Sequence, residues 1–159
     1  MKKLSSARLS YIAGFLDGDG SVYIKLTKNK TYRFKYQVSS YIVFYQSSIN
    51  IQFLQNLQKE LSIGYVRKRN DGVSEFIIGD EKSQLELIEK ILPYTKLKLE
   101  QLQLMKKILR KKKFVKCADG FLKLCGLIDG YKNLNYSKKR SQNSIEVRKV
   151  LVQNNLITP

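Results

Sequence analysis

A short run near the start of the chain limits the possible folds more than any other feature. The run reads YIAGFLDGDGS over residues 11–21, and apolar residues at helical spacing lead into it. Ser5 or Ser6 is a suitable N-cap for the helix, and the glycines of the run are suited to ending it. Carboxylates beside free helix carbonyls offer oxygen ligands to a hard cation. The sequence therefore predicts a helix whose C-terminal end can hold a metal ion.

The glycines of this run permit a second interpretation. Gly14 and Gly18 are four residues apart, so one face of the helix lacks side-chain bulk and another helix can approach it closely. The structural alternative is that Gly18 and Gly20 only end the helix, while Asp17 and Asp19 keep that end solvated. The run alone leaves these alternatives evenly balanced.

Composition narrows the partner and the chemistry. The 159 residues are enough for one domain, and 30 Lys plus Arg against 13 Asp plus Glu give a formal charge of +17. Nucleic acid is the simplest partner, because no apolar stretch approaches the ~18 residues of a membrane span and no lipidation or signal-peptide pattern appears. We therefore expect a soluble, intracellular protein without a membrane partner. With no histidine and only two cysteines, His-dependent nucleases, Ser-His-Asp triads and a zinc site of the usual ligands are excluded.

Apolar periodicity predicts the order helix, hairpin, helix, hairpin and then further helices. The expected strands are 22–28, about 33–45, 65–69 and 73–78, and an Asp-Gly turn joins the last two. The helices after the motif helix are expected at about 48–61, 83–92, 97–112, 118–134 and 144–154. The predicted fold class is α+β, a single domain over residues 1–159 with an antiparallel sheet curved into a saddle and covered by helices from behind.

One face of the predicted sheet is polar and basic, which suits DNA. A two-stranded ribbon fits the major groove, where arginine can pair with guanine and glutamine with adenine. Arg67, Arg69 and Gln37 are the expected base readers. The full set of expected DNA contacts is Tyr23, Lys25, Thr27, Asn29, Tyr32, Arg33, Lys35, Gln37, Ser39, Tyr41, Arg67, Arg69 and Glu75, with Lys113, Lys116, Lys138 and Lys139 on flanking phosphates. The alternative, an ordinary solvated sheet face, fits the net charge less well.

The run over residues 11–21 closely resembles the signature of the LAGLIDADG homing endonucleases. The similarity extends to Ser21-Val22, 37–39, 63–67, 93–98 and 133–135. It is strongest to single-motif members encoded in introns of algal organelle genomes. The resemblance implies an α-β-β-α-β-β-α fold and a homodimer on a long pseudo-palindromic site in double-stranded DNA. It also implies hydrolysis of one phosphodiester per strand across the minor groove, leaving short 3′ overhangs, in a chloroplast or mitochondrion.

The same resemblance assigns roles to individual residues. It makes Asp19 of each subunit, with the carbonyl of Gly18, the ligands of Mg²⁺ or Mn²⁺, and no small-molecule cofactor is implied. It places Gln46 and Lys98 at the edge of the site, and Asn50 where close relatives carry a basic residue. It places Ile12, Gly14, Phe15 and Gly18 in the dimer interface. The structural alternatives are that Lys98 is an ordinary surface lysine and that Gln46 is an ordinary strand-to-helix cap. Asp17 receives no role beyond local support.

Residues 124–131, LCGLIDGY, look like a second copy of the motif. Tyr131 stands near the position of the second carboxylate and no alternating strand follows, so we predict a core helix and keep the homodimer. Two other functions stay open from the sequence. The first is a catalytically silent DNA-binding or intron-splicing (maturase) protein of the same fold. The second is an RNA-binding protein whose sheet tyrosines stack on unpaired bases.

Overall fold

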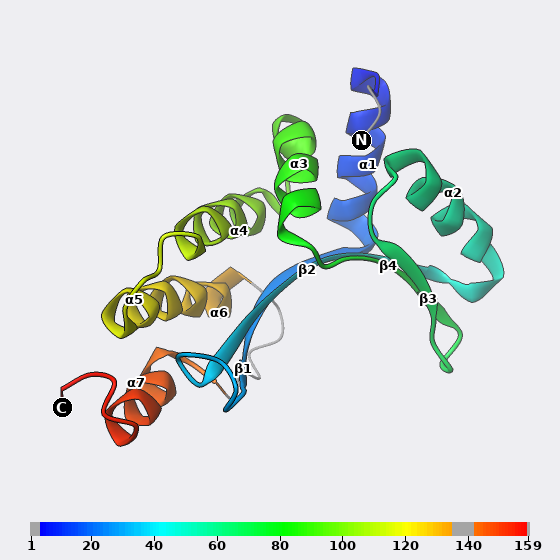
Figure 1. Ribbon diagram of the computed structural model, residues 1–159. Coiled ribbons are helices and arrows are strands. Elements are labelled where there is room, and N and C mark those ends of the chain that lie inside the picture. Colours follow the sequence, from blue (N-terminus) through cyan, green and yellow to red (C-terminus); the bar gives the residue numbers. More distant parts are fainter. Residues whose placement is uncertain (1–3, 135–141, 159) are drawn as a thin grey trace. The chain divides into compact units, whose positions relative to one another are not determined.

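The computed structural model describes residues 4–134 and 142–158 and has an α+β architecture (Figure 1). The motif helix α1 (Ser6–Asp19) is followed by strands β1 (Gly20–Lys28) and β2 (Tyr36–Ser47), the short helix η1 (Ser48–Asn50) and α2 (Ile51–Leu61). Next come β3 (Tyr65–Lys68), β4 (Val73–Ile78), α3 (Glu81–Ile91), η2 (Leu92–Tyr94) and α4 (Leu99–Lys112). The C-terminal part holds α5 (Ala118–Asp129), α6 (Tyr131–Leu134) and α7 (Ser144–Gln153). The predicted order of helices and strands is confirmed.

The four strands form one sheet in the order β1-β2-β4-β3. β4 pairs antiparallel with both β2 and β3, and the register places Gln46 opposite Ser74 and Arg67 opposite Glu75. The Asp-Gly turn between β3 and β4 forms as predicted, with Gly72 at φ +82°. The sheet therefore carries the end of β2, where Gln46 lies, beside the second hairpin.

The chain divides into two compact units. One comprises residues 1–22 and 40–103, and the other comprises residues 23–39 and 104–159. The single domain expected from the sequence stays a prediction. Within the described residues, no helix is both long and apolar enough to cross a membrane.

In the first unit, helix α1 begins and ends where the sequence predicts. The side chain of Ser5 accepts a hydrogen bond from the backbone N–H of Arg8, which caps the first turn. Ile12, Ala13 and Leu16 are fully buried. The helix ends at Gly20, whose backbone is extended and whose N–H donates to the carbonyl of Leu16. A Cβ at Gly20 would lie 2.6 Å from that carbonyl oxygen, so only glycine fits where the strand leaves the helix.

Two further helices of the first unit, α2 and α3, hold the strands β2, β3 and β4 in place. Helix α2 packs on β3 and β4 through Leu54, Leu57 and Leu61, which are buried. The side chain of Gln84 on α3 is also fully buried. Its Nε2 donates to the carbonyls of Ser40 and Ile78, at 2.8 Å each, so α3 is fastened to β2 and β4. Satisfying a buried amide in this way avoids a desolvation penalty of about 1–3 kcal/mol.

In the second unit, helix α5 packs on α6 and α7. The Tyr36 hydroxyl donates to Oε1 of Gln142 at 2.9 Å, and Lys112 Nζ donates to the carbonyl of Val38 at 3.0 Å. Leu124, Cys125, Ile128 and Tyr131 of the second motif-like run are all buried. Burial raises the pKa of the Cys125 thiol to about 12, which keeps it protonated and inert. The prediction that this run is a core helix is confirmed.

Three expected boundaries were wrong. The second strand begins at Tyr36 and not near Arg33, because Lys35 has a left-handed backbone (φ +61°) and closes a turn in which its N–H donates to the carbonyl of Tyr32. The helix expected over 118–134 breaks at Gly130, which separates α5 from α6. The second helix also starts later than expected, because residues 48–50 form η1 before α2 begins.

Two glycines of the second hairpin provide a test of the fold. Gly64 and Gly72 both have positive φ, but only at Gly64 would a Cβ collide with backbone, at the carbonyl oxygen of Ile77. Both alanine substitutions are expected to lose about 1–2 kcal/mol to left-handed backbone strain. Gly64→Ala should lose more, because backbone must also move. Urea denaturation of the two variants checks this, and equal losses would contradict the close approach of Gly64 to Ile77.

Candidate active site

A hollow lies beside the C-terminal end of α1 and brings together three of the four predicted catalytic residues. Asp19 comes from the last position of α1, Gln46 from the end of β2, and Asn50 from the end of η1. The lining consists of Tyr11, Phe15, Asp19, Gln46, Ile49, Asn50, Gln52 and Phe53. Asp19 is exposed, as is Asn50. The fourth residue, Lys98, does not line this hollow.

Aromatic packing holds the wall of the hollow in place. The Phe15 ring stacks on Phe44 with centroids 5.3 Å apart and meets Phe53 edge-on at the same distance. Tyr11 meets Phe53 edge-on at 6.3 Å. Such contacts add about 0.5–1.5 kcal/mol each beyond simple burial. They fix α1 against β2 and α2, and so hold Asp19 on α1 and Gln46 on β2 beside Asn50, which directly precedes α2.

Gln46 is oriented by the backbone that follows it. Its Oε1 accepts a hydrogen bond from the N–H of Ser47 at 2.8 Å. This local hydrogen bond agrees with the structural alternative, in which Gln46 is an ordinary cap between the strand and the helix. The amide nitrogen of Gln46 remains a donor for a second partner, since a primary amide carries two N–H hydrogens.

Asp17, to which the sequence assigned no role beyond local support, joins α1 to the segment after η2. Its Oδ2 accepts from the N–H of Lys96 at 2.7 Å, and its Oδ1 accepts from the N–H of Lys98 at 2.9 Å. The Lys98 ammonium turns back and donates to the backbone carbonyl of Asp17 at 2.5 Å. A cation at the carbonyl end of a helix is favoured by the helix dipole. Asp17 and Lys98 are therefore locked together at the motif.

The environment of Lys98 affects its charge. Burial lowers the pKa of its ammonium, and the negative charges of Asp17 and then Asp19 oppose that effect. Lys98 thus lies close enough to Asp17 and Asp19 to interact electrostatically with both carboxylates, although it does not line the hollow. Lys98 therefore has fixed hydrogen-bond partners at the end of α1, unlike the ordinary surface lysine that was the alternative interpretation.

The contacts of Asp17 lead to a testable prediction. Asp17→Ala leaves the N–H groups of Lys96 and Lys98 without their carboxylate, whereas the backbone carbonyl that accepts from the Lys98 ammonium stays. We expect a loss of about 1–3 kcal/mol in the free energy of unfolding. Urea denaturation measures the loss, with Asp119→Ala on the exposed first turn of α5 as the control. A loss no larger than that of the control would show that the carboxylate does not fasten this segment.

The donor atoms at the end of α1 suit a hard divalent cation. Mg²⁺ prefers carboxylate and carbonyl oxygens, which Asp19 and Gly18 supply. Within residues 4–134 and 142–158, no group of three or more His, Cys, Asp or Glu side chains comes together. Of the two carboxylates at this end of α1, Asp17 is occupied by the N–H groups of Lys96 and Lys98, so Asp19 is the one that lines the hollow.

The exposed face of α1 carries two glycines and so has room for the close approach of another helix, whereas the opposite face is buried. A Cβ added at Gly14 or Gly18 would have nothing within 4 Å. Ile12, by contrast, has an exposed fraction of zero and lies in the core of its own subunit. In a single subunit its side chain has no exposed surface, and the expectation that Ile12 contributes to a dimer interface stays a prediction. Tyr11, which is 49% exposed, adjoins this face instead.

The predicted DNA contacts of the second unit lie on β1, the turn and the start of β2. Lys25, Thr27, Tyr32 and Arg33 are exposed. Tyr23, Asn29, Lys35, Gln37 and Ser39 are half-buried, and Lys113 and Lys116 are exposed between α4 and α5. In the turn, the Asn29 side chain accepts from the N–H and hydroxyl of Thr31. Lys138 and Lys139 lie outside the described residues.

In the first unit, Tyr41 is half-buried, and the second hairpin carries an ion-pair cluster. Arg67 Nε donates to Glu75 at 2.9 Å, and Arg69 Nη1 donates to the other oxygen of Glu75 at 3.2 Å. Asp71 also accepts from Arg69 at 2.5 Å. The Glu75 side chain is only 7% exposed, whereas the two arginines are about half exposed. Glu75 is thus placed to orient the arginines, and its predicted contact with DNA stays a prediction.

Comparison with known proteins agrees with this geometry. The family model for the LAGLIDADG endonuclease matches residues 12–118. This chain belongs to the LAGLIDADG endonuclease family. Two members from algae extend the match beyond that range. The chain is 37% identical over 150 residues to DNA endonuclease I-CreI of Chlamydomonas reinhardtii, covering 94% of this chain and 91% of the relative. It is 35% identical over 144 residues to DNA endonuclease I-CvuI of Chlorella vulgaris, covering 91% and 89%.

Solved structures of LAGLIDADG endonucleases match the fold over almost the whole chain. I-CvuI in complex with its target in the presence of Ca superposes with a TM-score of 0.90 at 33% identity, covering 96% of this chain and 97% of the other. I-CvuI with the I-CreI target, in the presence of Mg and with the DNA not cleaved, gives a TM-score of 0.91. The archaeal enzyme I-Vdi141I, at 13% identity and a TM-score of 0.84, shares the fold. The predicted fold class is confirmed.

Proposed function

We propose that this protein is an intron-encoded, site-specific homing endonuclease that works as a homodimer on double-stranded DNA. The observation that carries the proposal is the meeting of Asp19, Gln46 and Asn50 in one hollow at the end of the motif helix. Support also comes from the family and from I-CvuI, a relative seen in complex with its target DNA. The charge of +17 suits a polyanion that two such chains clasp together.

Binding precedes the chemistry in this proposal. Exposed cations of the turn and of the second hairpin position the duplex, and Arg67, Arg69 and Gln37 read base edges. The glycine face of α1 meets the same face of a second copy, so both Asp19 carboxylates approach the DNA from the dimer axis. A C2 dimer fits a pseudo-palindromic site, because each subunit reads an equivalent half-site.

Hydrolysis then rests on carboxylates, a lysine and positioned water, since the chain has no histidine. Asp19 and the Gly18 carbonyl would hold Mg²⁺, or Mn²⁺ in its place, which activates water and screens the phosphate. Gln46 orients the attacking water through its amide. Lys98, whose ammonium is anchored on the Asp17 carbonyl, offsets negative charge beside Asp19. One phosphodiester per strand is cut, leaving short 3′ overhangs.

The alternative is a DNA-binding or maturase protein of the same fold without nuclease activity. The presence of Asp19, Gln46 and a fastened Lys98 favours the enzyme, because a silent binder needs none of them. An organelle, chloroplast or mitochondrion, is the proposed place of action. The algal sources of the relatives are consistent with that proposal.

Selection of cleaved sites from a randomised duplex library tests the proposal. With Mg²⁺ present, the protein should enrich a long, nearly palindromic sequence whose sequenced ends carry short 3′ overhangs. Chelation of Mg²⁺ should stop cleavage. Enrichment of bound but uncut DNA would favour the silent binder, and a preference for single-stranded RNA over duplex DNA would favour an RNA-binding protein.

A further inference from the structure

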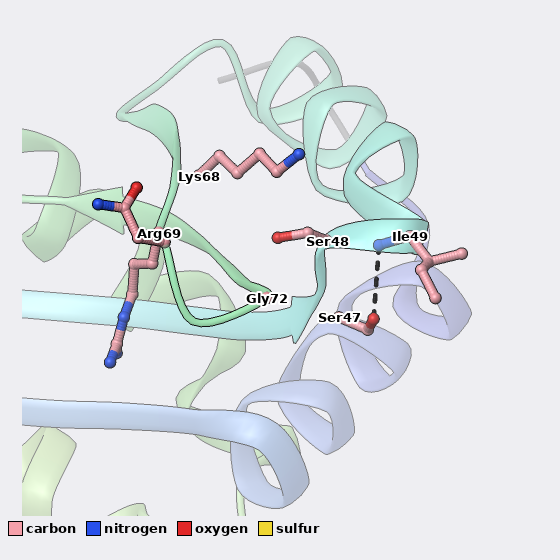
Figure 2. A pocket seen from close by; sticks show the side chains of 7 residues that line it. Ser47, Ser48, Ile49, Lys68, Arg69 and Gly72 are labelled. Carbon is pink, nitrogen blue, oxygen red and sulfur yellow. Dashed lines mark hydrogen bonds between the residues drawn. The ribbon is translucent and has the colours of Figure 1, made fainter.

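A second hollow adjoins the one that contains Asp19. Its lining consists of Ser47, Ser48, Ile49, Lys68, Arg69, Asn70 and Gly72 (Figure 2). Ile49 lines both hollows, and its side chain is 92% exposed, so it forms the ridge between them. Neither Ser48 nor Lys68 has been given a role so far.

Hydrogen bonds hold the two walls of the second hollow together. The N–H of Ser48 donates to the carbonyl of Gly72 at 2.8 Å, which joins η1 to the turn between β3 and β4. The hydroxyls of Ser48 and Ser74 are 2.9 Å apart and share a hydrogen bond. The Ser47 hydroxyl accepts from the N–H of Ile49 at 3.4 Å, as drawn in Figure 2. The hollow is therefore built by fixed backbone and not by loose side chains.

The two cations of this hollow differ in how their charge is used. The Arg69 guanidinium is held by Asp71 and Glu75, which compensate its charge. The Lys68 ammonium has no hydrogen-bond or ion-pair partner among the residues that the structure describes, and its side chain is exposed. Figure 2 shows the Lys68 side chain extending from β3 toward the side of the hollow where Ser48 lies, while Arg69 points away. Lys68 is thus the cation available to a ligand there.

The first hollow lacks a cation of its own. Its lining contains Asp19 and no lysine or arginine. Asn50 also lines it, but its amide side chain is uncharged. DNA carries about one negative charge per 1.7 Å of helix axis, so a duplex placed at Asp19 brings further phosphates to the neighbouring hollow. An exposed, uncompensated lysine beside a hydroxyl donor suits such a phosphate. Ser48 can accept from Ser74 and still donate its own hydrogen.

We propose that Lys68 and the Ser48 hydroxyl bind a backbone phosphate of the DNA, adjacent to the phosphate that lies at Asp19. The contact supplies positive charge beside the active site that Asn50 does not supply. It rests on the proposed function, because it takes duplex DNA as the ligand. The contact positions the strand and reads no base, so its loss should weaken binding about equally on all sequences.

The salt dependence of DNA binding tests this proposal. Lys68→Gln removes one phosphate contact per subunit, so the slope of log Kobs against log salt should become shallower by about 0.9 per contact, or about 1.8 for a dimer. Lys68→Arg keeps the charge and should keep the slope. Lys82→Gln is the matched control, because it removes an equally exposed cation from α3, which has no residue in either hollow.

Each outcome has a defined meaning. A shallower slope for Lys68→Gln, with the wild-type slope for Lys68→Arg and Lys82→Gln, supports the phosphate contact. Equal slopes for Lys68→Gln and wild type, when wild-type protein binds and cleaves its site, overturn it and leave the endonuclease intact. Wild-type protein that binds duplex DNA without cleaving it contradicts the proposed function instead, and the slope comparison still decides the role of Lys68.

Discussion

Asp19→Asn is expected to abolish DNA cleavage while leaving the fold and the DNA affinity in place. Asparagine has the size of aspartate, and Asp19 is exposed at the last position of α1, so the substitution adds no strain and no buried group. It removes the charge that would hold the cation. We expect cleavage to fall at least about a thousandfold, which corresponds to about 4 kcal/mol of transition-state stabilisation.

Single-turnover cleavage of the selected site, with DNA binding measured in Ca²⁺, checks this prediction. Asp119→Asn is the control, because it removes an exposed carboxylate from the first turn of α5. Cleavage should persist in the control and disappear in Asp19→Asn. Retained cleavage in Asp19→Asn would contradict a metal site at the end of α1.

Gly14→Leu is expected to produce a folded monomer that no longer cuts DNA. A Cβ at residue 14 would meet nothing within 4 Å inside the subunit and residue 14 is exposed, so the subunit should tolerate a side chain there. Replacing glycine within a helix should even stabilise α1 by roughly 0.5–1 kcal/mol. The same side chain would keep a second α1 from approaching closely. With the paired helices separated, the two Asp19 carboxylates cannot reach one site.

Sedimentation velocity, circular dichroism and cleavage assays on the same preparation separate these effects. Gly126→Leu is a matched control, since Gly126 is also an exposed helical glycine with nothing within 4 Å of its Cβ, but on α5. The control should stay dimeric and active. A dimeric and active Gly14→Leu protein would contradict the α1 seam.

Sequence reasoning succeeded where local pattern decides structure. Val22, Ile24 and Leu26 alternate and are buried on β1, and the Asp-Gly turn forms between β3 and β4. The cap at Ser5 needs only the N–H of Arg8, three residues away. In each of these cases the information lies within a few residues of the position predicted.

The features that the sequence did not reveal depend on partners far along the chain. Asp17 accepts hydrogen bonds from a segment 79 residues away, which no local pattern announces. The burial of Ile12 required knowing which face of α1 meets the subunit core. Glu75 is a charged residue that the sequence placed on the open face of the sheet, yet its side chain is only 7% exposed and pairs with two arginines.

Lys68 also has a signal in the sequence. The family resemblance implies a basic residue where this chain carries Asn50, and Lys68 adds a basic residue between Arg67 and Arg69 on the second hairpin. Linking the two positions required the shared ridge at Ile49, which only the three-dimensional structure supplies.

We propose that two chains bring their Asp19 residues together at one metal-binding site on DNA. A crystal structure of the protein with its selected duplex in Mn²⁺, with anomalous scattering to locate the metal, tests that claim most directly. We predict anomalous density against the Asp19 carboxylate and the Gly18 carbonyl of both subunits, with the two α1 helices packed at Gly14 and Gly18. Metal density elsewhere, or a single chain enclosing the cut site alone, would contradict it.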